Sequence, residues 1–593
     1  MKKKGFTLVE MLAVVVIMGL ILLVVIPQIQ NQISNRKESI HETTLEMIYN
    51  AADDFTSSDP STFQKIYNDD GNRTIYCISL QELVNAGKLE APIKNYTNGE
   101  ELDLSYIIQA VTNQFNEFEY TLTESAECDF DIEPVKVYYD PTLPVNGDTY
   151  PVLYDGMIPV VYENGHWVKA SMYKVWYNYA SGKGMWANAV TVNTNASQCK
   201  EDCIDTLRKH GREYYQNARV GEAISMDDIN GMYVWIPKFE YKVSGFGSGS
   251  GTSATSPGSI DVNFIAKNTT TPTSGYTIHP AFKFGDRQIG GIWVAKFEAS
   301  ANPESNCYLG SEASNCNKAS ETKKNEPKLY VTVTPNKNSW RYISIGNAYK
   351  AVSLMNASTS FNGLKSTVDT HLMKNTEWGA VAYLSQSSYG KYGKDGKEVF
   401  PNMYFNNATL TGCTLGKSGN NLSKVTLCQD SDGNKLNYNY AASYSGSTSG
   451  TIYGIFDMAG GTWEYVMGNF NRNEGSGSII LNDIYVEVED EEGNVTQELK
   501  TKRINDKYVD VYKTTTCADK ECAGSAMLKT ELSLSSNWWL DMYDFAVTDL
   551  EPWLIRGGSW ELKSQELGIF ALSKASGASN ATIGFRPVIV GQK

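Results

Sequence analysis

The chain has 593 residues, more than one hydrophobic core usually organises, so two to four domains are expected. It is 41% hydrophobic and 11% aromatic, which excludes a mainly disordered chain. The formal net charge of −15 gives no general attraction to phosphate backbones or anionic lipid, so direct nucleic-acid binding is not expected.

The first predicted element is an apolar helix that can cross a membrane. Residues 6–26 are almost all apolar, and at about 1.5 Å per residue they span about 30 Å, the thickness of a hydrocarbon core. Three lysines precede this run, so the positive-inside rule keeps the short leader in the cytoplasm and sends the remainder outside. The sequence therefore predicts a single-pass protein of the cell membrane with its C-terminus outside.

One carboxylate interrupts the apolar run. Glu10 costs roughly a few kcal/mol in hydrocarbon unless a positive group neutralises it. Cleavage after Gly5 would create a cationic amine on Phe6, and the amine of a neighbouring subunit could meet Glu10 inside the membrane. Assembly would then neutralise both charges.

The segment Gly5-Phe6-Thr7-Leu8-Val9-Glu10 resembles the processing site of type IV pilins and type II secretion pseudopilins. The resemblance implies cleavage between Gly5 and Phe6 by a prepilin peptidase, methylation of the Phe6 amine, and a role for Glu10 in assembly with other pilin subunits into an extracellular filament. Pro27 falls where many pilins kink their long helix, so it is a second predicted assembly residue. The alternative, an ordinary signal anchor, does not account for Gly-Phe before the run or for Glu within it.

Beyond Pro27 the pattern predicts that the helix continues and packs on a small head. Its apolar stripe consists of Ile29, Ile33, Ile40, Met47, Ile48, Ala51 and Phe55. In the head, residues 74–78 and 117–122 are predicted strands, and residues 80–86 a short helix between them. The segment 79–87 is similar to segments common in Gram-positive pilin heads.

Composition changes after the head. All 12 Trp lie at or beyond Trp167, and the Pro- and Gly-containing segment 140–147 has the chemistry of a linker. Short β-rich runs then carry Trp167, Trp176 and Trp186, which either pack in a core or bind sugar rings; core packing is favoured.

Six segments beyond residue 229 carry a second resemblance. They are 232–237, 292–298, 377–382, 457–464, 556–560 and 584–586. In this order they resemble the formylglycine-generating-enzyme superfamily, which has a C-type-lectin-like fold. Their glycines permit tight turns, and the adjacent aromatic residues can fill core positions.

Together these observations predict a multidomain α+β chain. It comprises a long transmembrane and pilin helix with a small α/β head, a small β module, and a large C-type-lectin-like α+β domain. The boundaries are a leader at 1–5, the helix at 6–56, the head at 57–133, a linker at 134–149, the β module at 150–194, a connector at 195–228 and the lectin-like domain at 229–593.

The catalytic branch of that superfamily uses two cysteines, at positions that correspond to Leu562 and Leu567. Leucine offers no thiolate for copper binding or thiol exchange, so the formylglycine-generating reaction is not expected. The chain also lacks HExxH, P-loop and GxSxG motifs, and its five histidines are scattered singly. No catalytic residue is predicted.

The resemblance implies a ligand-binding surface for glycan or protein between the Arg-Gly-Gly-Ser-Trp motif and the final Gly-Phe-Arg. The predicted ligand-binding residues are Trp560, Glu561, Lys563, Gln565, Glu566, Ser576 and Asn580. An ordinary exposed loop is equally compatible with these residues.

Calcium is the one cofactor that the sequence suggests. Glu464 matches the glutamate of the family's Asn-x-Trp-Glu motif, which joins a calcium site in some relatives, although Gly461 replaces the Asn. The alternative is that Glu464 accepts hydrogen bonds from backbone amides. The acidic run from Glu487 to Glu492 precedes Gly-Asn, and a solvated hairpin tip is favoured there over a calcium site.

The ten cysteines fall into neighbouring pairs. Metal ligation or free thiols are the alternative to disulfides, but the chain has only five His and no CxxC motif to supply zinc ligands, so disulfides are favoured. The predicted disulfides are Cys77–Cys128, Cys199–Cys203, Cys307–Cys316, Cys413–Cys428 and Cys517–Cys522. Disulfides indicate an oxidising, extracytoplasmic location.

The predicted function is that of a minor pilin or pseudopilin that displays a non-catalytic lectin-like domain on the cell surface, for adhesion. Two alternatives remain. One is a component of a type II secretion-like or DNA-uptake pilus machinery, and the other is a superfamily enzyme with unrecognised chemistry.

Overall fold

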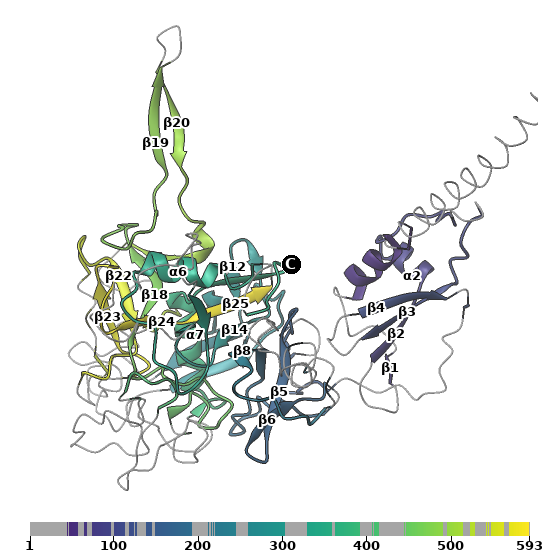
Figure 1. Cartoon of the computed structure of the whole chain (residues 1–593), viewed down its shortest axis with the longest axis horizontal. Coiled ribbons are helices and arrows are strands. Elements are labelled where there is room, and N and C mark those ends of the chain that lie inside the picture. The colour runs from purple at the N-terminus through teal and green to yellow at the C-terminus, as the bar shows by residue number, and fades with distance from the viewer. Residues whose placement is uncertain are drawn as a thin grey trace, which may run out of the picture. The chain divides into compact units, whose positions relative to one another are not determined.

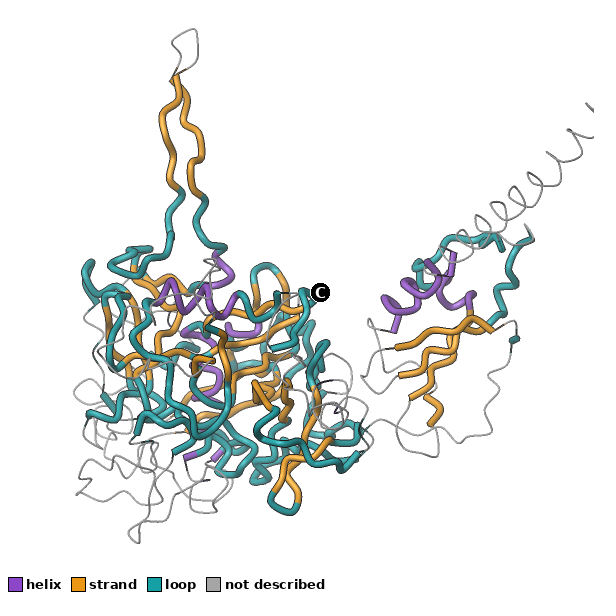
Figure 2. Tube along the Cα trace, viewed as in Figure 1, coloured by secondary structure: helices purple, strands orange, loops and turns teal. Residues whose placement is uncertain are grey.

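The computed structural model describes residues 44–126, 138–192, 212–244, 259–302, 329–391, 406–413, 444–513, 522–527, 541–562 and 568–591, with short gaps inside several of these ranges (Figures 1 and 2). It divides into two compact units, Met1–Lys136 and Val137–Lys593. Both are rich in β-sheet and contain few helices among the described residues.

In the first unit a helix packs on a four-stranded antiparallel sheet. In their order across the sheet the strands are β1 Lys65–Tyr67, β2 Thr74–Ser79, β3 Ile107–Thr112 and β4 Phe118–Thr123. Helix α2, Leu80–Asn85, follows β2 directly, and residues 44–45 and 47–56 are helical. The two strands and the short helix predicted for the head are confirmed.

Tyrosine contacts join the helix of residues 47–56 to strand β4. The rings of Tyr49 and Tyr120 stack with their centroids 6.0 Å apart. The Tyr120 hydroxyl donates to Asp53 Oδ1 at 2.9 Å, and the Leu122 amide donates to the Tyr49 hydroxyl at 3.2 Å. The helix is therefore fixed to the sheet by polar contacts as well as by apolar packing.

The predicted apolar stripe is confirmed in part. Ile48 and Ala51 are buried, and Phe55 packs against the core from a partly buried position. Met47 is 48% exposed, so its place in the stripe was wrong; Ala52 is buried in the core instead. The remaining members, Ile29, Ile33 and Ile40, lie outside the described residues.

Two sheets organise the second unit. The larger is antiparallel throughout, with strand order β17-β25-β14-β8-β7-β5-β6. Its strands are β5 Ile158–Glu163, β6 His166–Lys169, β7 Asn188–Val192, β8 Ile229–Pro237, β14 Gly291–Ala295, β17 Val368–Leu372 and β25 Pro587–Gly591. The second sheet contains β18 Trp463–Phe470, β21 Asp510–Tyr512, β22 Trp553–Arg556, β23 Leu572–Ala575 and β24 Ile583–Phe585.

Smaller elements surround these sheets. A three-stranded sheet contains β9 Phe239–Ser244, β10 Ser259–Phe264 and β11 Thr277–Ile278. The hairpins pair β12 Lys283–Phe284 with β13 Arg287–Gln288, β15 Ser300–Asn302 with β16 Tyr330–Thr332, and β19 Ile484–Glu489 with β20 Val495–Thr501. The β19–β20 pair confirms the hairpin predicted around the acidic run.

Helices α6, Ile345–Ser353, and α7, Asn375–Ser385, complete the second unit with short 3₁₀ turns at Pro280–Phe282 and Asp506–Tyr508. Every residue of α7 is buried. A Cβ on Gly379 would lie 2.0 Å from the Gly524 carbonyl oxygen, so only glycine allows α7 this close backbone approach. The six segments that carry the sequence resemblance lie within or beside β8, β14, α7, β18, β22 and β24.

The small β module is not separate, because its strands belong to the larger sheet. Ala189 in β7 lies opposite Tyr233 in β8, so residues on both sides of the predicted connector share one sheet. The side chains of Trp167, Trp176 and Trp186 are buried in the common core, which confirms the core interpretation of these aromatics.

The described part of the predicted linker is also ordered within the second unit. Asp140 is buried and accepts hydrogen bonds from the amides of Tyr179 and Thr142. The Trp235 indole donates to the Thr149 carbonyl at 2.9 Å. Pro and Gly content predicted a linker, but long-range hydrogen bonds fix its described residues within the second unit.

Candidate functional site

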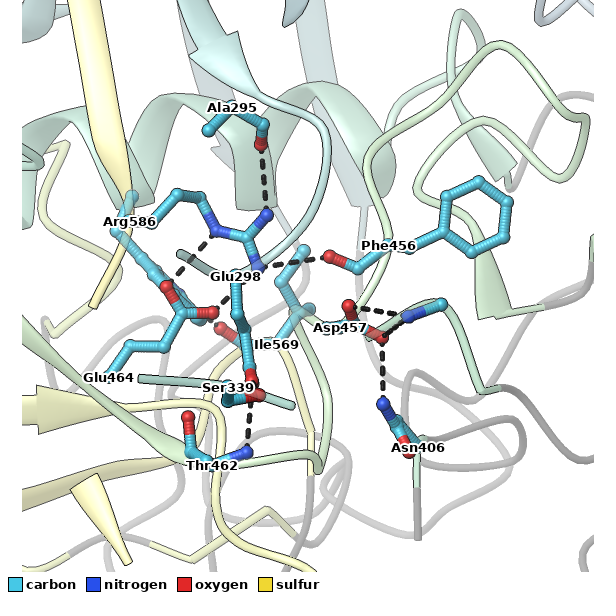
Figure 3. Close-up of polar contacts among 12 residues, drawn as sticks. Ala295, Glu298, Ser339, Asn406, Phe456, Asp457, Thr462, Glu464, Ile569 and Arg586 are labelled. Atoms are coloured by element: carbon cyan, nitrogen blue, oxygen red, sulfur yellow. Dashed lines mark hydrogen bonds and ion pairs between the residues drawn. The ribbon is translucent and has the colours of Figure 1, made fainter. Parts of the chain in front are cut away.

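A buried ion pair lies where β18 and the end of β24 meet (Figure 3). Arg586 donates from Nε to Glu464 Oε2 at 3.0 Å and from Nη2 to Glu464 Oε1 at 2.6 Å. Its Nη1 and Nη2 also donate to the carbonyls of Ala295 and Phe456, at 2.9 and 3.0 Å. Burial alone would lower the pKa of Arg586, but Glu464 outweighs it and raises this pKa above its ordinary value.

Two further carboxyl groups lie close to this pair. Burial, together with the charges of Asp457 and Glu464, raises the pKa of Glu298 well above its usual range. The Thr462 amide donates to Glu298 Oε1 at 2.8 Å, and the Ser339 hydroxyl bonds to its other oxygen. Glu298 was not predicted from the sequence as a site residue, although it ends one of the six segments.

Asp457 ties a neighbouring loop to the same cluster. Its carboxylate accepts from the Gly412 amide at 2.9 and 3.0 Å and from the Asn406 side-chain amide at 2.9 Å. Burial raises the pKa of Asp457, and Arg586 opposes this effect. We call Glu298, Asp457, Glu464 and Arg586 the buried acid cluster.

The buried acid cluster is satisfied by protein groups. Both oxygens of Glu464 accept from Arg586, a partner that neither the calcium prediction nor the backbone-amide alternative included. Within the described ranges no group of three or more His, Cys, Asp or Glu side chains is arranged to hold a metal ion. The geometry suits a structural role, in which one guanidinium fixes several chain segments.

Position 461 has a steric reason to be glycine. Its φ is +70°, a conformation that favours glycine, and a Cβ there would lie 2.4 Å from Glu298 Oε1. The Gly461 carbonyl also accepts from the Trp560 amide at 2.9 Å. This bond ties Trp560, a predicted ligand residue, to the residue before Thr462, whose amide donates to Glu298.

The structure brings three of the predicted ligand residues together around Arg341. The Arg341 guanidinium carbon lies 4.8 Å from the centroid of the Trp560 ring, and Nη1 donates to the Ala581 carbonyl at 2.6 Å. Glu561 is exposed and close enough for its charge to act on Arg341. Asn580 is exposed, and its carbonyl accepts from the Tyr342 amide at 2.8 Å.

We call Arg341, Trp560, Glu561 and Asn580 the Trp560 face. Arg341 could not be predicted from the sequence, because it lies far from Trp560 in the chain and only the fold brings the two together. Ser576 is partly buried at a turn, where its carbonyl accepts from the Ser476 amide. Lys563, Gln565 and Glu566 lie outside the described residues.

Of the two leucines that the sequence analysis compared with catalytic cysteines, Leu562 is described and Leu567 is not. Leu562 is partly buried and packs against the main hydrophobic core. Its side chain therefore has an apolar packing role at this position.

His371 on β17 forms a second buried charged group, which was not predicted from the sequence. Its Nε2 is 2.9 Å from Glu377 Oε1 and its Nδ1 is 3.2 Å from Asp369 Oδ1. Burial opposes a charged ring, but the two carboxylates outweigh it and raise the pKa of His371 to about 9. Asp369 also accepts from Lys507 and Tyr508, at 2.9 and 2.7 Å. His371 therefore joins β17 to α7 through Glu377, and Asp369 joins β17 to the 3₁₀ turn at 506–508.

Three cysteines fall within the described residues. Cys77, Cys413 and Cys522 are disulfide-bonded, and no described cysteine is free. The other members of the five predicted pairs lie outside the described residues, so the pairings stay predictions.

The predicted processing and assembly residues, Gly5, Phe6, Glu10 and Pro27, also lie outside the described residues, as does the apolar segment 6–26. No helix within the described part of the chain is both long and apolar enough to cross a membrane.

Comparison with known families bears on this N-terminal segment. Residues 1–26 match the model of the prokaryotic N-terminal methylation motif. The chain therefore has a pilin-type N-terminus. The motif implies processing by a prepilin peptidase and assembly with other pilin subunits, and it is consistent with membrane anchoring. No curated protein matches the chain significantly.

Proposed function

We propose that this chain is a minor pilin or pseudopilin whose second unit is a non-catalytic, lectin-like binding domain used for adhesion at the cell surface. The observation that carries the proposal is the methylation motif at residues 1–26. It lies at the start of the smaller first unit, and a much larger second unit follows in the chain. This order suits a subunit that is anchored through its N-terminus and presents a large domain.

The Trp560 face supports a binding role. Trp560 is only partly buried, Glu561 and Asn580 are exposed, and Arg341 stacks on the indole. An aromatic ring beside charged and amide groups can contact a sugar ring or a protein surface. Backbone bonds to Gly461 and Tyr342 hold this face on the rigid core, as binding loops require.

Leucines at positions 562 and 567 support the non-catalytic part of the proposal, because they cannot provide the two thiolates that formylglycine-generating enzymes use to oxidise their substrate.

The size of the second unit favours a minor position in the filament. A domain of this bulk on every subunit would crowd the shaft, so we place the protein at a tip or at rare sites.

The N-terminus provides the first test. Mass spectrometry of the chain from its native membrane should find Phe6 first, with a methyl group on its amine. A Gly5→Val variant should keep the leader, whereas Glu10→Gln should be cleaved normally but enter filaments poorly. A wild-type chain that retains residues 1–5 would overturn the pilin assignment.

Adhesion is tested separately. Cells that carry Trp560→Ala should lose attachment about tenfold or more, as for an aromatic residue central to an interface. Leu550→Ala, at an 80% exposed residue, is the matched control and should leave attachment unchanged. Equal attachment by the wild-type, Trp560→Ala and Leu550→Ala strains would contradict a binding role for the Trp560 face. The position in the filament is tested by immunogold labelling, and uniform labelling along the filaments would contradict a minor position.

A further inference from the structure

The β19–β20 hairpin projects from the second unit (Figures 1 and 2). Among the described strands, β19 and β20 pair only with each other, so each has one outer edge that no described strand covers. The root of the hairpin is fixed to the body of the unit. The Ile504 amide donates to the Ile480 carbonyl at 3.0 Å, and the Arg503 amide donates to Asp483 Oδ1 at 2.9 Å.

Strand β19 carries exposed apolar side chains on both faces of the hairpin. Because side chains alternate along a strand, Ile484, Val486 and Val488 share one face. Tyr485 and Glu487 share the other. Ile484 is 45% exposed, Tyr485 54% and Val488 37%. A two-stranded hairpin is only marginally stable alone in water, so this apolar surface favours a partner that covers it.

The two outer edges differ in how well they resist pairing. On β20, Lys500 is an extra residue at a β-bulge, because Leu499 and Thr501 lie opposite consecutive residues of β19. A bulge and an edge lysine both discourage pairing with another strand. Residues 484–488 of β19 contain neither, and Glu487 is their only charged residue. The outer edge of β19 is therefore the one that is open to a partner.

The sequence of β19 is complementary to itself in an antiparallel pairing centred on Val486. Val486 then lies opposite Val486 of a second copy, and Ile484 lies opposite Val488, so the apolar face continues across both copies. On the other face, Tyr485 lies opposite Glu487 of the second copy, where its hydroxyl can donate to the carboxylate. The arrangement has twofold symmetry, so each of the unlike contacts occurs in both directions.

Charge favours this register over its neighbours. A pairing centred on Glu487 would place two Glu487 carboxylates opposite each other, and one centred on Tyr485 would place Glu487 opposite Asp483. Like charges directly opposite each other are destabilising. In the self-complementary register, pairing is confined to residues 484–488, because the next pair would join Asp483 to Glu489.

We propose that β19 binds β19 of a second copy of this chain, edge to edge and antiparallel about Val486, so that the two hairpins form one continuous sheet. Backbone hydrogen bonds join the two edges, and the apolar side chains on each face become neighbours. The contact uses one short strand from each copy, so the association is weak and reversible. The inference does not rest on adhesion or on the pilin-type N-terminus.

The test is sedimentation of the full-length chain in detergent over a series of concentrations, which should show monomers in equilibrium with dimers. Hydrogen exchange should slow with concentration in peptides that cover residues 484–488, and not in peptides that cover residues 495–499. Val486→Lys places two ammonium groups opposite each other and should weaken association about tenfold or more. A mixture of the Val486→Lys and Val486→Glu chains should associate better than either chain alone, because its central pair has opposite charges.

The matched control is Thr496→Lys, which adds the same charge at an exposed residue of β20, one strand further from the contact. It should associate within about twofold of wild type. Both lysine variants should keep the tryptophan emission of the wild type, which separates lost association from lost folding. A wild-type chain that stays monomeric would overturn the proposal, also where residues 484–488 become protected only when another envelope protein is added. So would equal losses in both lysine variants, or association of Val486→Lys at the wild-type level.

Discussion

Arg586 and Glu464 form a two-point ion pair between segments 122 residues apart, and neither side chain reaches solvent. The same guanidinium binds carbonyls of Ala295 and Phe456, so it joins the larger sheet, the second sheet and the loop before β18. A lysine ammonium could not make all these contacts at once, because they need a planar guanidinium that donates several hydrogen bonds in fixed directions.

Breaking this pair should strongly destabilise the second unit. Glu464→Gln removes the negative partner and leaves a buried positive charge, which should cost about 3 kcal/mol or more of unfolding free energy. All 12 Trp lie in the second unit, so urea unfolding followed by tryptophan emission reports on that unit.

Arg472→Lys is the control for this prediction. It changes an ion pair with Asp506 at a partly exposed site and should cost less than about 1 kcal/mol. Similar small losses in both variants would show that the buried pair contributes little.

Local features were the ones that sequence could predict. The helix after β2 begins at Ser79, whose side chain and amide exchange hydrogen bonds with Glu82, and both residues are visible within four positions. The β19–β20 hairpin was predicted for a similar reason, since Gly493 and Asn494 follow the acidic run. In both cases the physical cause is contained in a short segment.

Features that depend on distant contacts could not be predicted in this way. The pairing of β7 with β8 bridges the predicted connector, and neither strand specifies its partner by its own residues. Glu464 was identified from its motif, but its bond to Arg586 was not, although both residues stood in recognised segments. Arg341 near Trp560 carried no local signal at all.

His371 predicts a specific pH dependence. Burial alone would lower its pKa, but Glu377 and Asp369 raise it from 6.5 to about 9. Because the folded pKa is the higher one, the stabilising contribution is fully present below pH 6.5 and is lost as pH rises through about 9.

A comparison of wild type with His371→Gln isolates this contribution from the other titrating groups. Their difference in unfolding free energy should be largest below pH 6.5 and should fall by an amount on the order of 3 kcal/mol by pH 9. The measurement is urea unfolding at a series of pH values. A difference that stays constant over this range would mean that the ring is not charged in the folded protein.

The N-cap of α2 gives a prediction for the first unit. Ser79→Ala removes the side-chain acceptor for the Glu82 amide and should destabilise the helix by about 1 kcal/mol. Because the first unit has no Trp, hydrogen exchange of peptides that cover residues 74–89 is the measurement. Gln81→Ala, which loses only an exposed contact with Asn85, should exchange nearly as slowly as wild type, and equal acceleration in both variants would contradict a capping role.

Gly461 allows backbone strain to be separated from crowding. Gly461→Ala places a Cβ at φ +70° and within 2.4 Å of Glu298 Oε1, so it should displace a carboxyl group of the buried acid cluster. Gly221→Ala is a matched control, because φ there is +87° and no heavy atom lies within 4 Å of the added Cβ. Backbone strain alone should lower the unfolding free energy of the control by about 1 kcal/mol. Gly461→Ala should lower it by about 2 kcal/mol more, because the added methyl group also displaces Glu298. Tryptophan-monitored unfolding measures both losses, and equal losses would show that Glu298 yields to the methyl group without cost.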